Sequence, residues 1–304
     1  MEVWKIYSVA VEEFKAENYD AALRLLDEIK AVAPNYRKAY LLEAYIWRAQ
    51  YNFVREFDAL AKVIPLFDSS EPAQKNLLSH TLHLFAAASR ALSCPEESVN
   101  FSVLSASLSD NNQDACEEIS NALFAACHSE NFSTADFQDL YDEYKKYLAD
   151  IKPYPRRFYR HEKIRTGFLS ADFKNHVMIN WSRSLLTKLD KNLFKTYFYS
   201  NTKTSDNVTK ILKDSADGWR DIRDLSDEAA AKLIRDDEID ILFDLSGHTA
   251  NNRLRIAAYR PATVQVSGIG YMNSTGLDCF DYFLSDVYCA GDESYFTEKV
   301  IKLP

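Results

Sequence analysis

The sequence predicts an all-helical domain followed by an α/β domain with a parallel sheet. All 7 glycines of the 304 residues lie beyond residue 165, and glycine serves the positive-φ turns that strands need more often than helices do. The charge divides in the same way. Residues 1–150 contain 13 Lys and Arg against 24 Asp and Glu, a net charge of −11, whereas residues 151–304 contain 23 against 21, a net charge of +2.

The domain boundary is predicted between residues 152 and 153. Pro153 and Pro155 follow there, and two closely spaced prolines end any helix. The helical domain therefore spans residues 1–152 and the α/β domain residues 153–304.

Composition excludes several broad classes of protein. A hydrophobic fraction of 47% and a charged fraction of 27% are ordinary for a soluble globular chain. No apolar run reaches the roughly 18 residues of a membrane span, and the first residues lack the order of a secretory signal. The net charge of −9 argues against a nucleic-acid partner. The 5 cysteines show no CxxC spacing, which fits reduced thiols in a cytoplasmic protein rather than a disulfide framework or a zinc site.

The first domain is predicted to be helical throughout, with a trace of an internal repeat. Apolar residues across 3–14 recur at spacings of three and four, which indicates one apolar helical face. Residues 18–23 are echoed by residues 52–57, and the offset of 52 − 18 = 34 is the period of tetratricopeptide helical hairpins. We expect one recognisable and one degenerate unit of this kind, and a plain helical bundle remains as the alternative.

The second domain alternates strands with helices. Helices are predicted near 179–189 and 207–213 and after the capping residue Ser226. Strands are predicted at 164–170, 193–200, 218–222, 239–245, 263–269 and 280–285. This alternation indicates a parallel sheet covered on both faces, with ligands at the carboxyl ends of the strands.

Two of these strand ends carry a carboxylate and an imidazole four residues apart. Asp172 and His176 follow the first strand, and Asp244 and His248 follow the fourth. A neutral imidazole accepts a proton at cellular pH, and a neighbouring carboxylate can orient it or act as the base itself. We therefore expect hydroxyl activation, provided that both imidazoles share one open rim. The structural alternative is that Asp172 caps the next helix and that the histidines are ordinary loop residues.

Other nucleotide-binding and hydrolytic motifs are missing from the sequence. It contains no GxGxxG, GxxxxGK[ST], GxSxG or HExxH pattern. These absences disfavour a nicotinamide or flavin enzyme, a P-loop protein, an α/β-hydrolase and a zincin metalloprotease.

Four ordered blocks carry a resemblance to a known family. They read IRTGFLSADFKNH at 164–176, DILFDLSGHT at 240–249, RPATVQVSGIGY at 260–271 and DYFLSD at 281–286. Together they resemble the amino-terminal catalytic lobe of the O-linked N-acetylglucosamine transferase family, including its bacterial and Spindly-type members. A tetratricopeptide-like segment ahead of that lobe is also the arrangement of this family.

The resemblance implies a GT-B fold, in which two Rossmann-like lobes enclose the active site. It implies inverting transfer from a UDP-sugar, with N-acetylglucosamine expected, to Ser or Thr of an acceptor protein or peptide, without a metal or other cofactor. Asp172 and His176 match the catalytic positions proposed for proton handling and sugar contact. The implied substrate-binding residues are His248, Thr249, Ile269, Gly270 and Tyr271.

The sequence departs from the family in two respects. The family often has Trp-Leu-Gly-Tyr-Pro where this chain has Gly-Ile-Gly-Tyr-Met at 268–272, so the sugar contacts are expected to differ. The 304 residues end near the point where the second lobe would begin, so this fragment is expected to be inactive alone. Two alternatives stay open: a non-catalytic helical-repeat interaction module with a relic Rossmann-like domain, and a glucosyltransferase that modifies Asn.

Overall fold

The structure is a computed structural model that describes residues 2–67 and 74–303. Its packing divides the chain into two compact units, Met1–Ser129 and Glu130–Pro304. The predicted order of helices first and a parallel sheet second is confirmed. The last helix before the sheet packs with the second unit, although it precedes residue 152. The domain boundary at 152/153 therefore stays a prediction about where the class of secondary structure changes.

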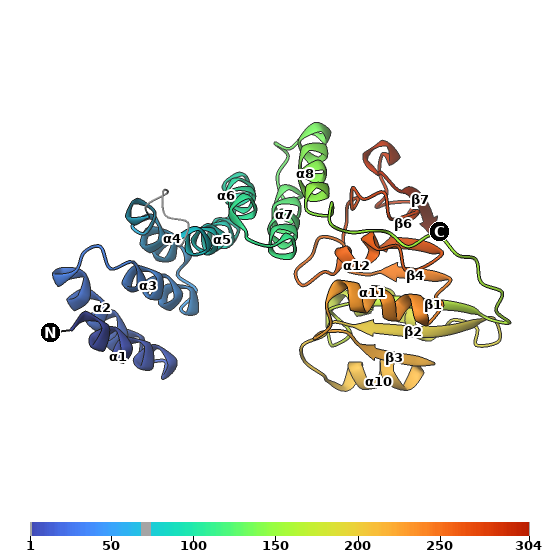
Figure 1. The fold of residues 1–304 in the computed structure, drawn as a ribbon, viewed down its shortest axis with the longest axis horizontal. Coiled ribbons are helices and arrows are strands. Elements are labelled where there is room, and N and C mark those ends of the chain that lie inside the picture. The colour runs from blue at the N-terminus through green and yellow to red at the C-terminus, as the bar shows by residue number, and fades with distance from the viewer. Residues whose placement is uncertain (1, 68–73, 304) are drawn as a thin grey trace. The chain divides into compact units, whose positions relative to one another are not determined.

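The first unit contains α-helices that pack on one another in chain order, as in helical-repeat proteins (Figure 1). Asn18 and Asn52 directly precede the second and fourth helices, and the side chain of Asn52 accepts a hydrogen bond from the Arg55 N–H. The 34-residue echo thus marks two equivalent helix starts. The helices are α1 (Val3–Lys15), α2 (Tyr19–Val32), α3 (Arg37–Ala49), α4 (Phe53–Ala61), α5 (Lys75–Ala91), α6 (Pro95–Leu108) and α7 (Asn112–Ala126), with a 3-10 turn η1 (Ile64–Leu66) after α4.

The second unit is built on a sheet whose order is β3-β2-β1-β4-β5-β6-β7, with every pair parallel. This is the strand order of a doubly wound fold. All six predicted strands are present, and β7 and α12 are additions that the sequence did not predict. The strands are β1 (Ile164–Ser170), β2 (Phe194–Ser200), β3 (Gly218–Asp221), β4 (Ile241–Asp244), β5 (Val264–Gly268), β6 (Tyr282–Asp286) and β7 (Lys299–Leu303). The helices are α8 (Thr134–Lys146), α9 (Val177–Thr187), α10 (Asn207–Ser215), α11 (Asp227–Asp236) and α12 (Leu254–Ala258), with a 3-10 turn η3 (Glu293–Tyr295).

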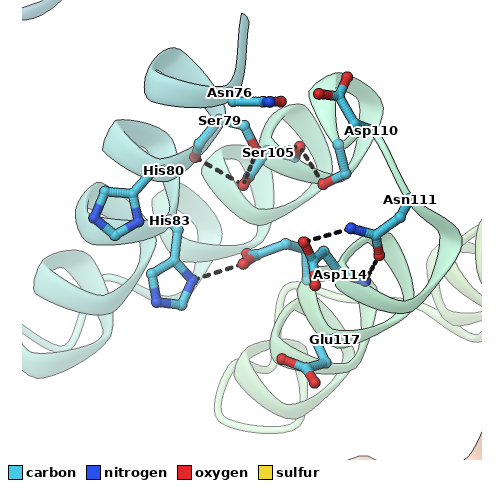
Figure 2. A pocket seen from close by; sticks show the side chains of 11 residues that line it. Asn76, Ser79, His80, His83, Ser105, Asp110, Asn111, Asp114 and Glu117 are labelled. Carbon is cyan, nitrogen blue, oxygen red and sulfur yellow. Dashed lines mark hydrogen bonds and ion pairs between the residues drawn. The ribbon is translucent and has the colours of Figure 1, made fainter. Parts of the chain in front are cut away.

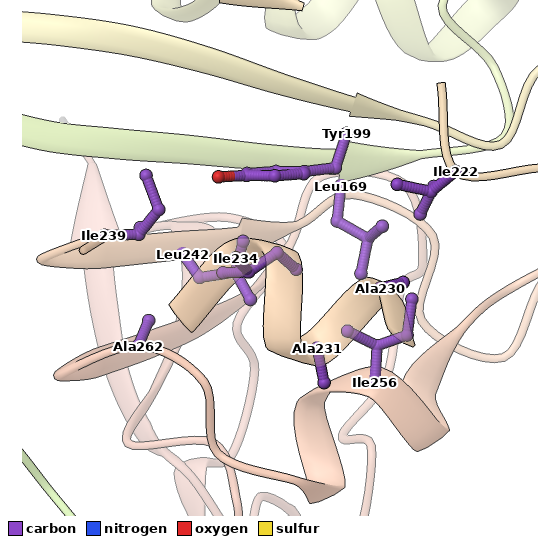
Figure 3. Packing of buried hydrophobic residues seen from close by; sticks show 10 residues of the cluster. All are labelled: Leu169, Tyr199, Ile222, Ala230, Ala231, Ile234, Ile239, Leu242, Ile256 and Ala262. Carbon is purple, nitrogen blue, oxygen red and sulfur yellow. The ribbon is translucent and has the colours of Figure 1, made fainter. Parts of the chain in front are cut away.

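Helices cover both faces of the sheet because successive strand residues point to opposite sides. Leu169 of β1 and Tyr199 of β2 pack on α11 and α12, as Figure 3 shows. Their neighbours Phe168 and Phe198 pack on α9 and α10 from the other side. The predicted two-sided burial of a parallel sheet is therefore confirmed.

Helix α8 is fixed to the second unit by two buried tyrosines, Tyr141 and Tyr144. The hydroxyl of Tyr141 donates to the carbonyl oxygen of Ser274 over 3.1 Å. Gly276 lies against the same ring, with a φ of +67° and room for no side chain, since an added Cβ would stand 2.1 Å from Cγ of Tyr141. This close approach lets α8 pack on the loop that follows β5.

Gly276→Ala should loosen this contact and lower the free energy of unfolding. A non-glycine residue at positive φ costs about 1 kcal/mol or more, and the collision with Tyr141 adds about 1–3 kcal/mol of overpacking. Gly291→Ala is the matched control, because Gly291 has a φ of +54° but an added Cβ meets no atom within 4 Å. Urea unfolding of both variants measures the difference, and equal losses would contradict the account.

Candidate active site

Three neighbouring strands bring the predicted site residues to one edge of the sheet. β1 pairs with β4 so that Leu169 lies beside Asp244, and β4 pairs with β5 so that Asp244 lies beside Ser267. The loops that leave these strands therefore start side by side. The prediction that the ends of the first and fourth strands adjoin is confirmed.

The loop after β1 presents Asp172 and His176 together at the surface. The Nδ1 atom of His176 lies 3.8 Å from an Asp172 oxygen, and the two side chains are 40% and 18% exposed. Nζ of Lys174, a residue that the sequence pattern did not single out, lies 3.7 Å from the other Asp172 oxygen. A carboxylate, an imidazole and an ammonium group thus meet at the carboxyl end of a central strand.

His176 also caps α9. Its Nδ1 accepts a hydrogen bond from the Met178 N–H over 3.3 Å, so the proton of the neutral ring lies on Nε2. The capping role that the structural alternative gave to Asp172 therefore belongs to His176. Asp172 keeps both carboxylate oxygens for ion pairs and for a ligand.

The loop after β4 holds His248 in a different environment. Its ring is 1% exposed, its Nε2 donates to the carbonyl oxygen of Thr275 over 2.9 Å, and the rings of Tyr144 and Tyr271 lie 5.2 and 5.5 Å from it. Burial lowers the pKa of His248 to about 4. The expectation that both imidazoles face one open groove is therefore wrong, because α8 packs over the fourth strand end.

Asp244 supports the same loop from inside. Its carboxylate accepts hydrogen bonds from the Gly247 N–H at 2.8 Å and from Oγ of Ser267 at 3.0 Å. These hydrogen bonds tie the carboxylate to its own loop and to β5. Burial raises the pKa of Asp244 to about 6. In this structure the hydrogen bonds of Asp244 and His248 that are described above hold loop segments in place.

The turn after β5 is strained. Ile269 has a φ of +72°, which is rare for a β-branched residue, and the Gly270 N–H donates to the carbonyl oxygen of Gly268 over 2.9 Å. A hydrogen bond that spans two residues across a positive-φ centre defines the rarer, strained γ-turn. An added Cβ on Gly270 would lie 1.8 Å from the carbonyl oxygen of Leu245. Strain of this kind is concentrated at functional sites.

The remaining predicted residues divide by exposure. Thr249, Ile269 and Gly270 are half-buried, whereas Tyr271 is buried. The Oγ1 of Thr249 donates to the carbonyl oxygen of Ser246 over 2.8 Å, which stabilises the loop. Asp172 and His176 form the predicted polar pair that is exposed to solvent. The strained turn follows β5, which β4 separates from β1 in the sheet.

The helical unit has a hollow of its own, with a volume of ≈ 320 Å³, between α5, α6 and α7 (Figure 2). We call it the α5–α7 hollow. The Nδ1 of His83 lies 2.6 Å from a carboxylate oxygen of Glu118 across it. Among the described residues that line it, Lys and Arg are absent, and the acidic ones are Asp110, Asp114, Glu117 and Glu118.

Metal sites and membrane-spanning helices are both absent from residues 2–67 and 74–303. These residues hold no group of three or more His, Cys, Asp or Glu side chains placed to hold a metal ion. None of their helices combines the length and the apolar character that crossing a membrane needs.

His248→Gln should reduce the loss in the free energy of unfolding that occurs as the pH falls from 6.5 to about 4. The unfolded chain protonates His248 near pH 6.5, whereas the folded chain resists protonation down to about pH 4. The stabilisation is therefore complete above pH 6.5, and about 3 kcal/mol of it is lost as the pH falls to about 4. His248→Gln removes this loss, which urea unfolding across the pH window measures.

Asp244→Asn should have the opposite effect and increase the loss in the free energy of unfolding as the pH falls. The folded-state pKa of Asp244 is about 6 against an ordinary 3.8, so its contribution is complete below pH 3.8 and is lost as the pH rises through about 6. Without this residue, acid destabilises the chain more steeply than in the wild type. If both variants changed the pH dependence of the free energy of unfolding in the same direction, the pKa shifts assigned to His248 and Asp244 would be contradicted.

Several curated proteins are similar to a little under half of this chain. A protein from Hordeum vulgare named "Probable UDP-N-acetylglucosamine–peptide N-acetylglucosaminyltransferase SPINDLY" is 37% identical over 144 residues, which are 45% of this chain and 15% of that protein. A protein of the same name from Arabidopsis thaliana is 37% identical over 148 residues, or 46% of this chain and 16% of that protein. The Caenorhabditis elegans UDP-N-acetylglucosamine–peptide N-acetylglucosaminyltransferase is 28% identical over 147 residues, or 47% and 13%. The chain therefore spans about a sixth of the length of these curated relatives or less.

One solved structure matches the fold of nearly the whole chain. It is an O-GlcNAc transferase mutant from Thermobaculum terrenum, with a TM-score of 0.74 and 24% sequence identity over 99% of this chain and 57% of that one. The predicted fold class, helices followed by a Rossmann-like lobe of GT-B type, is confirmed. A model of the family described as Glycosyl transferase family 41 matches residues 147–304. Because this match covers more than half of the 304 residues, the chain belongs to glycosyl transferase family 41.

Proposed function

We propose that this chain supplies the helical region and the amino-terminal catalytic lobe of a protein O-glycosyltransferase. The reaction transfers N-acetylglucosamine, the sugar in the names of the relatives, from UDP to a Ser or Thr hydroxyl, without a metal. The observation that carries the proposal is the exposed Asp172–His176 pair at the end of β1. The family match supports the reaction class.

The proposed roles follow from the hydrogen bonds of the pair. Nδ1 of His176 is engaged with the Met178 N–H, so its Nε2–H is a donor toward a sugar or diphosphate oxygen. Asp172 is then the base that takes the proton from the acceptor hydroxyl. The hydroxyl oxygen bonds to the anomeric carbon from the face opposite UDP, and UDP leaves with the bonding electron pair, which inverts that centre.

The surroundings of the pair support a sugar site beside it. Ile269 packs against the hydrophobic cluster that contains Phe173, which lies within the Asp172–His176 segment, and Met178, which follows it. The strained turn at Gly270 therefore lies against the loop that carries the proposed base. Among the predicted contacts, Ile269, Gly270 and Thr249 are open enough to meet a sugar, whereas His248 and Tyr271 act by supporting the loops.

The acceptor is proposed to be a protein that also contacts the helical unit. The α5–α7 hollow has four acidic residues on its walls, which favours a basic segment of the acceptor. The net negative charge of residues 1–150 also favours a basic segment of the acceptor.

The burial of His248 favours a second candidate function. A catalytic lobe was expected to expose two imidazoles, and this one exposes His176 alone of that pair. A non-catalytic interaction module that keeps the fold would show the same burial. Assays of transfer separate the two candidates.

Residues 1–304 alone should transfer no sugar when incubated with UDP-N-acetylglucosamine and an acceptor protein. The resemblance implies that a second lobe makes most UDP contacts and stabilises the departing diphosphate, and such charge stabilisation is a large catalytic contribution. Measurable turnover by this fragment, followed by transfer of radiolabelled sugar, would refute the expectation.

In the full gene product, Asp172→Asn should lower kcat by about 10²–10⁴-fold, the usual contribution of a general base. The fold should persist, because among the described residues the ion-pair partners of the carboxylate are Lys174 and His176, at 3.7 and 3.8 Å, and Asn keeps the shape of the side chain. Asp214→Asn, on the exposed side of α10, is the matched control and should retain full activity. A kcat for Asp172→Asn close to that of the control would remove Asp172 from the mechanism.

A further inference from the structure

A second pocket lies wholly within the unit Glu130–Pro304, between α8 and the loops that follow β5 and β6. We call it the α8 pocket. Its volume of ≈ 610 Å³ falls in the range of pockets that hold a small-molecule ligand or a short peptide segment. The predicted site residues do not line it. We therefore consider a separate ligand for the α8 pocket.

The described lining of the α8 pocket combines five aromatic side chains with uncharged polar ones and a single carboxylate. Rings of Phe132, Phe137 and Tyr141 follow one another along α8 and its approach, with centroids 6.5 and 6.3 Å apart. Tyr295 and Phe296 face them from the loop after β6. Among the described lining residues, Asp292 alone carries a charge, and its carboxylate accepts the Ser294 N–H at 2.9 Å. Such walls favour an aromatic or large aliphatic side chain over a charged one.

The α8 pocket adjoins the loops that follow β4 and β5. Tyr141 forms part of its wall and stacks on His248 with ring centroids 6.5 Å apart. Met272, another wall residue, directly follows Tyr271 in the loop after β5. We therefore expect a ligand of the α8 pocket to contact the loop after β5 as well.

Segments next to the α8 pocket are held by hydrogen bonds before any ligand binds. The buried carboxylate of Glu298 accepts hydrogen bonds from Oγ of Ser274 at 2.6 Å and from the Thr275 N–H at 2.9 Å. The amino end of α8 is fixed by a capping box between Ser133 and Asp136. Such preorganisation reduces the ordering cost of binding.

We propose that the α8 pocket is a specificity subsite for the acceptor polypeptide. It takes an aromatic or large aliphatic side chain that flanks the Ser or Thr to be modified. This inference rests on the proposed function, because it names the acceptor class for the same site. Its occupant is a peptide, because the rings suit an apolar side chain and polar lining residues such as Gln138 and Ser294 can hydrogen-bond a peptide backbone.

The test measures binding of fluorescent peptides to the 304-residue chain by anisotropy. Each peptide has one central serine and either Phe or Ala at a given flanking position, with neutral residues elsewhere. We expect at least one position where Phe binds about tenfold more tightly than Ala, as burial of one aromatic side chain provides.

Two variants alter the α8 pocket without touching the core. Tyr295→Ala removes an aromatic wall residue that is 53% exposed, and Thr134→Trp fills the pocket from the exposed first turn of α8. Both should reduce the Phe preference to less than about threefold, a difference of under 1 kcal/mol by the affinity scale. Tyr288→Ala is the matched control, because Tyr288 is 89% exposed in the same loop and does not line the pocket.

The outcomes separate this inference from the proposed function. Loss of the Phe preference in both pocket variants, with the preference kept in Tyr288→Ala, supports the subsite. Equal binding of Phe and Ala peptides at every position, or a preference that survives both variants, overturns it. Transfer by the full gene product without any such preference keeps the proposed function and overturns the subsite. Phe-selective binding that both variants abolish, without transfer, keeps the subsite and overturns the proposed function.

Discussion

The parallel pairing of β1 with β4 and of β4 with β5 determines which side chains of this protein can meet. Because the carboxyl ends of parallel strands lie at one edge, the loops after Ser170, Asp244 and Gly268 start as neighbours. Helices on both faces bury the apolar residues of β1, β2 and β4, so the polar residues of the loops after β1 and β4 gather at this edge. The Asp172–His176 pair and the strained turn at Ile269 both depend on that arrangement.

Most of the second unit could be predicted from local pattern, since its strands are runs of apolar residues between polar turns. β7 was missed because its residues are largely exposed, with lysines at 299 and 302, and α12 because it has only 5 residues. The Asp172–His176 contact was predictable from spacing. The burial of His248 was not, because the tyrosines that cover it lie about a hundred residues earlier in the chain.

The burial of His248 changes the expected site from a symmetric one into an asymmetric one. A symmetric rim with two imidazoles would have assigned proton transfer to either strand end. Instead, the polar pair belongs to β1 alone, and the fourth strand end joins α8 in a buried aromatic cluster. The side of the edge near β1 thus suits proton transfer and sugar contact, and the side near α8 suits apolar recognition.

The most direct measurement of the central claim is a structure of the full gene product with a non-hydrolysable UDP-sugar and an acceptor peptide bound. The account predicts the acceptor hydroxyl within about 2.6–3.2 Å of an Asp172 oxygen, which is the reach of a general base. It also predicts the sugar against the loop of Gly270. An acceptor hydroxyl bound at another part of the lobe, with Asp172 facing only solvent, would contradict the account.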